Sequence, residues 1–115
     1  MIQIPHQARI FIAHEPINFR SGIDGTAAIC RQVLEQDPMS GAVFVFRNRL
    51  GTMIRLLSYD GQGFLLCIKR FSVGRLKWWF PKNYDKEVVA AEVQVLLWGG
   101  NPSNAGFKEI WRRVS

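Results

Sequence analysis

The sequence predicts an α+β fold in which a helix packs on a four- or five-stranded antiparallel meander, with further helices toward the carboxyl end. Apolar residues recur at helical spacing near the amino end, and again after residue 80. Between these regions, four short apolar runs alternate with glycine-containing turns. The chain of 115 residues is 48% hydrophobic and 21% charged. This size and composition predict one globular domain, residues 1–115.

A strand and then a helix are the first expected elements. Residues 9–13 are β-prone and precede Pro16, which ends the strand. The apolar stripe of the helix consists of Ile23, Ala27, Cys30 and Leu34. Ser21 or Asp24 is the expected amino-terminal cap. Asp37–Pro38 is the expected end, because a proline disfavours helical backbone in the residue before it.

Four strands are expected in the middle of the chain, at residues 42–47, 53–59, 64–69 and 75–80. The segments between them are residues 48–51, 60–63 and 72–74, and each contains a glycine that can adopt positive φ. Because such short turns join neighbouring strands, the strands are predicted to run antiparallel.

Alternation along these strands predicts two unlike faces of the sheet. The face expected under the helix is apolar and carries Ile54, Leu56, Phe64, Leu66 and Ile68. The other face carries Met53, Arg55, Leu57, Cys67 and Lys69, and alternation adds Arg47, Arg75, Lys77 and Trp79. A shift of register by one residue would exchange the faces.

After the expected strands, Asp85 can cap a second helix over residues 86–98, and Gly99–Gly100 would end it. The valine content of this segment also permits a strand. Residues 101–104 form a loop in this interpretation. Residues 107–114 have the apolar spacing of a short amphipathic helix.

The charge of the chain favours a polyanionic partner. Its net charge is +6, from 15 Lys and Arg against 9 Asp and Glu. Seven of the cations fall within residues 47–77, with Phe71 among them and Trp78 and Trp79 directly after the last. Such a face can bind phosphates and stack on bases. A solvated face with core tryptophans, or a surface for a protein partner, gives the same pattern.

Candidates for catalysis and metal binding are weak. Cys30 and Cys67 lie in apolar runs at no zinc-binding spacing, so two buried free thiols are expected. His14 and Glu15 are adjacent, so in a strand they point to opposite faces. We therefore expect no enzyme, no cofactor and no metal site. A small nuclease acting through Asp24 and Asp60 is the least favoured alternative.

Targeting and membrane signals are missing from the sequence. No basic and then apolar leader opens the chain, and no apolar run approaches the roughly 20 residues that a membrane span needs. A cytoplasmic protein without membrane contact is expected.

Several short motifs occur in a specific order. They are Asn18–Gly25 (NFRSGIDG), Asp37–Gly41, Val43–Arg49 (VFVFRNR), Tyr59–Gly63 (YDGQG) and Lys69–Arg75. In this combination, over about residues 9–99, the chain resembles the TnpB accessory proteins of insertion sequence 66-type elements, the second-open-reading-frame products. The resemblance implies an accessory role in DNA mobility. It also implies that the transposase encoded by the same element is the partner and carries the chemistry.

The resemblance also carries over individual positions. They are Arg20, Asp24, Gly25, Arg47, Arg49, Asp60, Gly61, Gly63, Lys69, Arg70, Gly74 and Arg75. The chain departs from the family at Asn18, where aspartate is usual, and at Thr26, where leucine is usual. It also departs in a divergent basic tail over residues 100–115.

The sequence therefore predicts a non-catalytic accessory protein of insertion-sequence transposition that binds transposase, DNA or both through a basic sheet face. The expected binding residues are Arg20, Arg47, Arg49, Arg55, Lys69, Arg70, Arg75, Lys77 and Trp79. The alternative is a protein-interaction module, or a homodimer paired through edge strands or exposed tryptophans, that does not bind nucleic acid.

Overall fold

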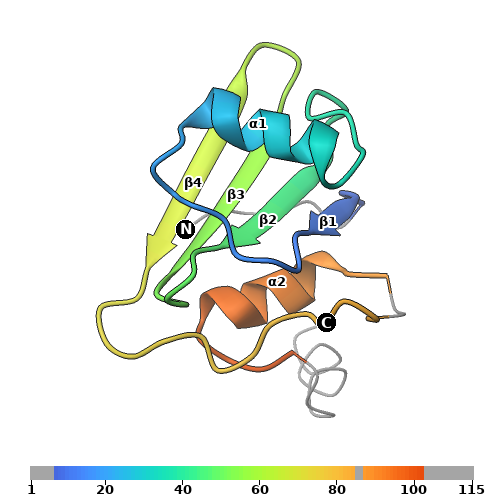
Figure 1. Cartoon of the computed structure of the whole chain (residues 1–115). Helices are drawn as coiled ribbons and strands as arrows, with labels where there is room; N and C mark the ends of the chain where they lie inside the picture. Colours follow the sequence, from blue (N-terminus) through green and yellow to red (C-terminus); the bar gives the residue numbers. More distant parts are fainter. Residues whose placement is uncertain (1–6, 85–86, 103–115) are drawn as a thin grey trace.

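A four-stranded sheet lies between two helices in the computed structural model, which describes residues 7–84 and 87–102 (Figure 1). The strands are β1 (Ile10–Ile12), β2 (Val43–Arg47), β3 (Met53–Tyr59) and β4 (Phe64–Arg70), and the helices are α1 (Ile23–Gln32) and α2 (Ala90–Leu97). The strand order in the sheet is β1-β2-β3-β4. The α+β class is confirmed.

The sheet is mixed, so the prediction of a wholly antiparallel sheet is wrong for one pair. β1 runs parallel to β2, with Ile10 opposite Val43. The connection between them contains α1, and a crossover through a helix returns the chain in the same direction. The other two pairs, β2–β3 and β3–β4, are antiparallel as expected.

Two polar side chains organise the hairpins of the sheet. Asn48 Oδ1 accepts the N–H groups of Thr52 and Met53 at 2.9 and 3.0 Å, and Gly51 has φ +71° in the same turn. Asp60 Oδ1 accepts the N–H groups of Gln62 and Gly63, and these bonds lower the pKa of Asp60 below its usual value. The turns predicted at residues 48–51 and 60–63 are therefore confirmed.

Helix α1 packs the expected stripe against the sheet only in part, since Ile23 is half-buried and Leu34 lies beyond the end of the helix, and its ends differ from the prediction. Ala27 and Cys30 are buried against the sheet. Gly22 is the N-cap and no side chain caps it, so the predicted caps Ser21 and Asp24 are wrong. The helix ends at Gln32, ahead of the predicted Asp37–Pro38 stop, and the chain soon afterwards adopts positive φ at Glu35.

The predicted division of the sheet faces is wrong. In β3 and β4, Arg55 lies opposite Ile68 and Leu57 opposite Leu66, whereas Ile54 lies opposite Lys69. The hairpin joins the strands through four residues, 60–63, whereas the predicted faces required an odd number. Arg55 therefore lies beneath α1, and Lys69 lies on the opposite face, toward α2.

No strand forms at residues 75–80, which is the second departure from the predicted meander. Between β4 and α2 the described residues contain no helix or strand. The aromatic side chains of this segment pack on one another instead, with the ring centroids of Trp78 and Phe80 4.7 Å apart and those of Phe80 and Tyr84 5.1 Å apart. Burial of these rings replaces the ladder hydrogen bonds that a fifth strand would have made.

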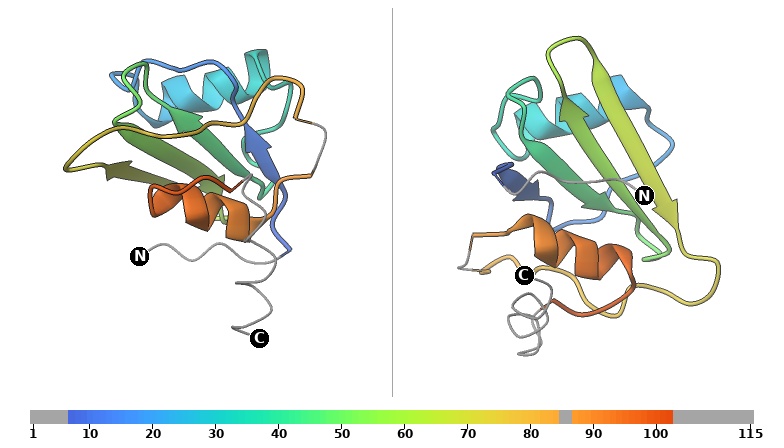
Figure 2. Two further views of the ribbon diagram at one scale, coloured as in Figure 1. Left: turned by 90° about the horizontal axis from the view of Figure 1, so that it is seen from below. Right: turned by 180° about the vertical axis from the view of Figure 1, so that it is seen from behind.

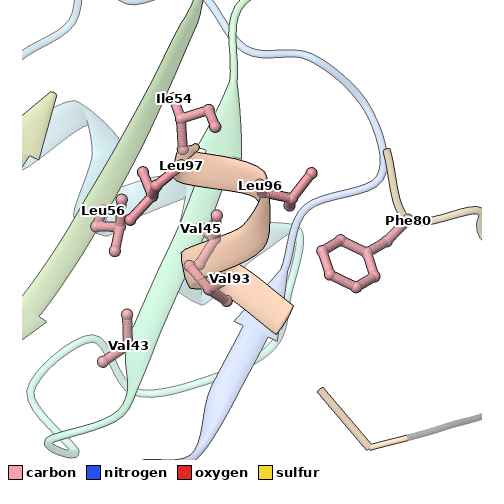
Figure 3. Close-up of a cluster of buried hydrophobic side chains, with 8 residues drawn as sticks. All are labelled: Val43, Val45, Ile54, Leu56, Phe80, Val93, Leu96 and Leu97. Carbon is pink, nitrogen blue, oxygen red and sulfur yellow. The ribbon is translucent and has the colours of Figure 1, made fainter. Parts of the chain in front are cut away.

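Helix α2 covers the second face of the sheet (Figure 2). Val93, Leu96 and Leu97 pack on a buried cluster that includes Val45 and Leu56 (Figure 3). The predicted helix at residues 86–98 is confirmed in part, since it begins at Ala90. The Asp85 cap and the helix at residues 107–114 lie outside the described residues.

Coverage of both faces explains the continuous apolar runs in β2 and β3, because neither face is left to solvent. Phe44, Phe46 and Leu57 pack toward α1, and alternate residues of the same strands pack toward α2. Cys30 and Cys67 are both free, and Cys30 is buried as predicted, whereas Cys67 is half-buried. Within the described residues, neither helix is long or apolar enough to cross a membrane.

Candidate nucleic-acid interface

The structure separates the predicted binding residues into interior and surface groups. Arg55 is 2% exposed, and Arg47 and Trp79 are half-buried. The remaining six are exposed, and they are Arg20, Arg49, Lys69, Arg70, Arg75 and Lys77. A partner can therefore reach only part of the predicted surface directly.

The guanidinium of Arg55 binds the segment that leads into α1. Its Nη1 donates to Ser21 O and Thr26 Oγ1, both at 2.7 Å, and its Nη2 donates to Phe19 O at 2.8 Å. The guanidinium carbon also lies 4.3 Å from the centre of the Phe19 ring. All three acceptors are neutral, and burial lowers the pKa of Arg55. Because two of its acceptors flank Arg20, Arg55 positions that residue.

Arg47 and Trp79 join the irregular segment after β4 to the end of β1. Arg47 Nη2 donates to His14 O at 2.6 Å, and its guanidinium carbon lies 5.4 Å from the centre of the Trp79 ring. Trp79 Nε1 donates to Ala13 O at 2.9 Å. Each side chain therefore has intramolecular partners, which gives both residues a structural role.

The Trp79 contacts predict a measurable loss of stability on substitution. Trp79→Phe removes the donor to Ala13 O and weakens the contact with Arg47, so we expect the free energy of unfolding to fall by about 1–2 kcal/mol. Urea denaturation followed by circular dichroism measures it. The control is Lys77→Met, at an exposed neighbour, which should change stability by less than about 0.5 kcal/mol. Equal stability of the two variants would contradict the assignment.

Five exposed cations lie around one end of the sheet. They are Arg20, Arg49, Lys69, Arg70 and Arg75, here called the basic rim. Arg49 lies in the β2–β3 turn, and Lys69 and Arg70 end β4. The two antiparallel pairings bring the end of β4 to the start of β3, next to this turn (lower left in Figure 1).

Backbone hydrogen bonds bring the segment after β4 to the rim. Leu76 N donates to Gly51 O at 2.7 Å, and Phe71 N donates to Thr52 O at 2.9 Å. These bonds bring Arg75 beside the β2–β3 turn. Gly51 has no side chain there, and a Cβ at this position would lie 4.0 Å from Arg75 Cβ. Lys77 is exposed on the same segment as it leads away toward Trp79.

Arg20 and Arg49 line a shared pocket of about 690 Å³. Its other lining residues are Pro16, Ile17, Asn18, Phe19, Asn48, Leu50 and Met53. The pocket thus combines two guanidinium groups with an apolar wall. Sequence reasoning missed the contribution of Phe19 and Asn48 because the pocket forms only when residues 16–20 pack beside the β2–β3 turn. In the sequence, Asn48 lies between Arg47 and Arg49 in the motif VFVFRNR, and this position could have indicated that Asn48 belongs to the site.

Acidic residues are scarce around the rim. From residue 38 to residue 84 the sequence contains eight Lys or Arg and one acid, Asp60. Asp60 lies in the β3–β4 turn, which is at the opposite end of the sheet (top of Figure 1). An anion approaching the four rim cations of this stretch therefore meets no carboxylate from the same end of it, whereas Arg20 lies between Glu15 and Asp24 in the sequence.

The residues of the nuclease alternative occupy structural positions. Asp60 accepts two backbone hydrogen bonds in its turn, and Asp24 lies in the first turn of α1. Across residues 7–84 and 87–102, no group of three His, Cys, Asp or Glu side chains is arranged to hold a metal ion.

One family model matches most of the chain, and two uncharacterized proteins are similar to it. The family model described as IS66 Orf2 like protein matches residues 8–106. The uncharacterized protein y4hO of Sinorhizobium fredii is 31% identical over 112 residues, which are 97% of this chain and 96% of y4hO. The uncharacterized protein y4jC of the same organism is 37% identical over 77 residues, 67% of this chain and 64% of y4jC. No solved structure matches significantly.

Proposed function

The chain belongs to the IS66 Orf2-like family, and from this premise we propose that it is a non-catalytic accessory protein of insertion-sequence transposition that binds DNA through the basic rim. The family implies association with the transposition machinery, in which the chemistry of strand cleavage and joining belongs to the transposase. In the proposed role the accessory protein supplies a docking surface for the DNA of the element.

The grouping of exposed cations at one end of the sheet supports this proposal. Arginine guanidinium groups bind phosphate oxygens in a bidentate manner, and phosphate contacts supply most sequence-independent affinity for DNA. Arg49, Arg70 and Arg75 come from three different segments and converge on one end of the molecule. The pocket beside Arg20 and Arg49 adds apolar surface that a sugar or an unstacked base can contact.

Salt-dependent binding to duplex DNA tests the proposal. If all five rim cations neutralise phosphates, the logarithm of the association constant falls against the logarithm of salt concentration with a slope of about −4.5. Affinity for a labelled duplex of about 25 base pairs, measured by fluorescence anisotropy, then falls about 500-fold between 50 and 200 mM NaCl.

Two outcomes of this measurement would contradict DNA binding through the basic rim. Folded protein that shows no saturable binding to duplex at 50 mM NaCl, or binding that does not depend on salt, would contradict the DNA proposal. Co-purification with the transposase that is lost when the rim cations are neutralised would then assign the rim to that protein partner.

A further inference from the structure

Among residues 7–84 and 87–102, no strand lies beside the outer edge of β4. β4 is the last strand of the sheet and pairs with β3 on one side only, over all seven of its residues. The opposite edge strand, β1, has three residues. An edge strand presents unpaired backbone N–H and C=O groups, and proteins usually shorten or charge such edges to prevent pairing. β4 is long, and its charged residues, Lys69 and Arg70, stand only at its carboxyl end.

Apolar surface accompanies this edge. Leu65 is 52% exposed and Ile68 is 50% exposed, although both lie in the strand. Trp98, just after α2, is 63% exposed. A pocket of about 560 Å³ opens beside the strand, lined by Leu56, Cys67, Ile68, Lys69, Arg70, Leu97 and Trp98. Exposed backbone and exposed apolar side chains at the same edge indicate a surface for another β-strand.

We propose that β4 pairs antiparallel with β4 of a second copy of the chain, so that two sheets join into one of eight strands. The two-fold axis of such a pair is perpendicular to the sheet, so each face of one copy continues as the same face of the other. Residues directly opposite one another share a face. Odd-numbered residues of one β4 therefore face odd-numbered residues of the other.

Full overlap of residues 64–70 fixes the register of the pair. Cys67 then lies opposite Cys67 of the partner subunit, and Leu65 lies opposite Lys69 of the partner subunit. The register within one copy places Leu65 and Cys67 on the α2 face, opposite Ser58 and Leu56. The exposed Leu65 of each copy is thereby brought next to Cys67 and Lys69 of the other, which line the apolar pocket.

The charges at the two ends of β4 favour a second copy in this orientation. The carboxyl end carries Lys69 and Arg70, and the turn before the amino end carries Asp60, whose pKa is lowered so that it stays ionised. Antiparallel pairing brings each cationic end toward the acidic turn of the other copy, whereas parallel pairing would bring like charges together. The pairing does not rest on the DNA-binding proposal, but it draws on two of the five rim cations, Lys69 and Arg70.

Cross-linking of the unmodified chain tests this inference. Opposed Cys67 residues have Cβ atoms about 5 Å apart, within reach of a short bis-maleimide. Cys30 is fully buried, and burial raises its pKa to about 11, so its thiol does not compete at pH 7. We expect light scattering to give about 26 kDa, twice the 13.2 kDa chain, and cross-linking to trap that dimer. Cys30→Ser should cross-link like the wild-type chain, and Cys67→Ser should not cross-link.

A matched pair of variants tests the apolar contact. Leu65→Lys places a cation opposite Lys69 of the partner subunit and should weaken the dimer at least ten-fold. Val73→Lys also introduces a lysine, at a site that is 90% exposed outside the sheet, and its dimer should match the wild-type dimer. Circular dichroism verifies that both variants fold. A monomeric wild-type chain at millimolar concentration, a dimer that Cys67 does not cross-link, or equal dimerisation by both lysine variants would overturn the proposal.

Discussion

Replacing Arg55 with methionine is expected to lower the free energy of unfolding by about 3–5 kcal/mol. Methionine keeps much of the apolar length of the side chain but donates no hydrogen bonds. Phe19 O and Ser21 O would lose their donors at partly buried positions, and Thr26 Oγ1 would lose its donor at a buried one. Each stranded polar group costs about 1–3 kcal/mol, although the segment before α1 can relax to recover part of that cost. Urea denaturation followed by circular dichroism measures the loss.

One further substitution separates the planar geometry of the Arg55 guanidinium from its charge, and another serves as a control at an exposed site. Arg55→Lys retains the positive charge, but one ammonium group cannot match the planar fork that reaches three acceptors, so we expect a loss of about 2–3 kcal/mol. Arg49→Met removes an exposed arginine and should change stability by less than about 0.5 kcal/mol. If Arg55→Met were as stable as Arg49→Met, the structural role of Arg55 would be wrong.

The position of Arg55 shows where sequence patterns stop being informative. Alternation correctly placed Arg55 and Leu57 on one face of β3, and the glycine-containing turns correctly delimited three of the four expected strands. A charged residue in a strand is normally assigned to solvent, because burial of an isolated charge is costly. Here the carbonyls of Phe19 and Ser21 offset that cost, and they come from a segment about 35 residues away. Strand periodicity carries no information on such distant partners.

The absent strand at residues 75–80 has a related explanation. Alternating apolar and basic residues in this segment satisfy a strand pattern. In the structure, two of these residues make other hydrogen bonds instead. Leu76 N donates to the β2–β3 turn, and Trp79 Nε1 donates to the chain just after β1. These contacts direct the chain along one end of the sheet, away from the edge of β4. As a direct consequence, no other strand in the described part of the chain pairs with the outer edge of β4.

The sequence predicted which cations belong to the candidate site but not where they lie on the fold. The sequence identified the cations between residues 47 and 77, and the family motifs added Arg20. Their expected place was a sheet face, yet both faces are covered by helices. The exposed cations are therefore carried by turns and strand ends. Arg49 and Arg75 are 26 positions apart in the sequence and become neighbours through the bond between Leu76 N and Gly51 O.

Neutralising three rim arginines is expected to weaken duplex binding far more than neutralising three cations elsewhere. The rim variant combines Arg49→Gln, Arg70→Gln and Arg75→Gln. Each lost phosphate contact reduces the steepness of the salt dependence by about 0.9, so the slope should become shallower by about 2.7. At 100 mM NaCl, affinity should fall about 100-fold or more, because three charge-assisted hydrogen-bonding groups are lost together. Fluorescence anisotropy over a series of NaCl concentrations measures both quantities.

The control variant has the same net charge and separates local contact from overall attraction. It combines Arg9→Gln, Arg31→Gln and Lys82→Gln at exposed sites before β1, in the last turn of α1 and after Phe80. Screening limits the reach of an exposed charge to about 10 Å at 0.1 M salt, so the control should keep the wild-type slope within about one unit and lose affinity only modestly. Equal effects of the two triple variants would mean that net charge alone attracts DNA. In that case the rim would not be the docking surface, however its arginines are arranged.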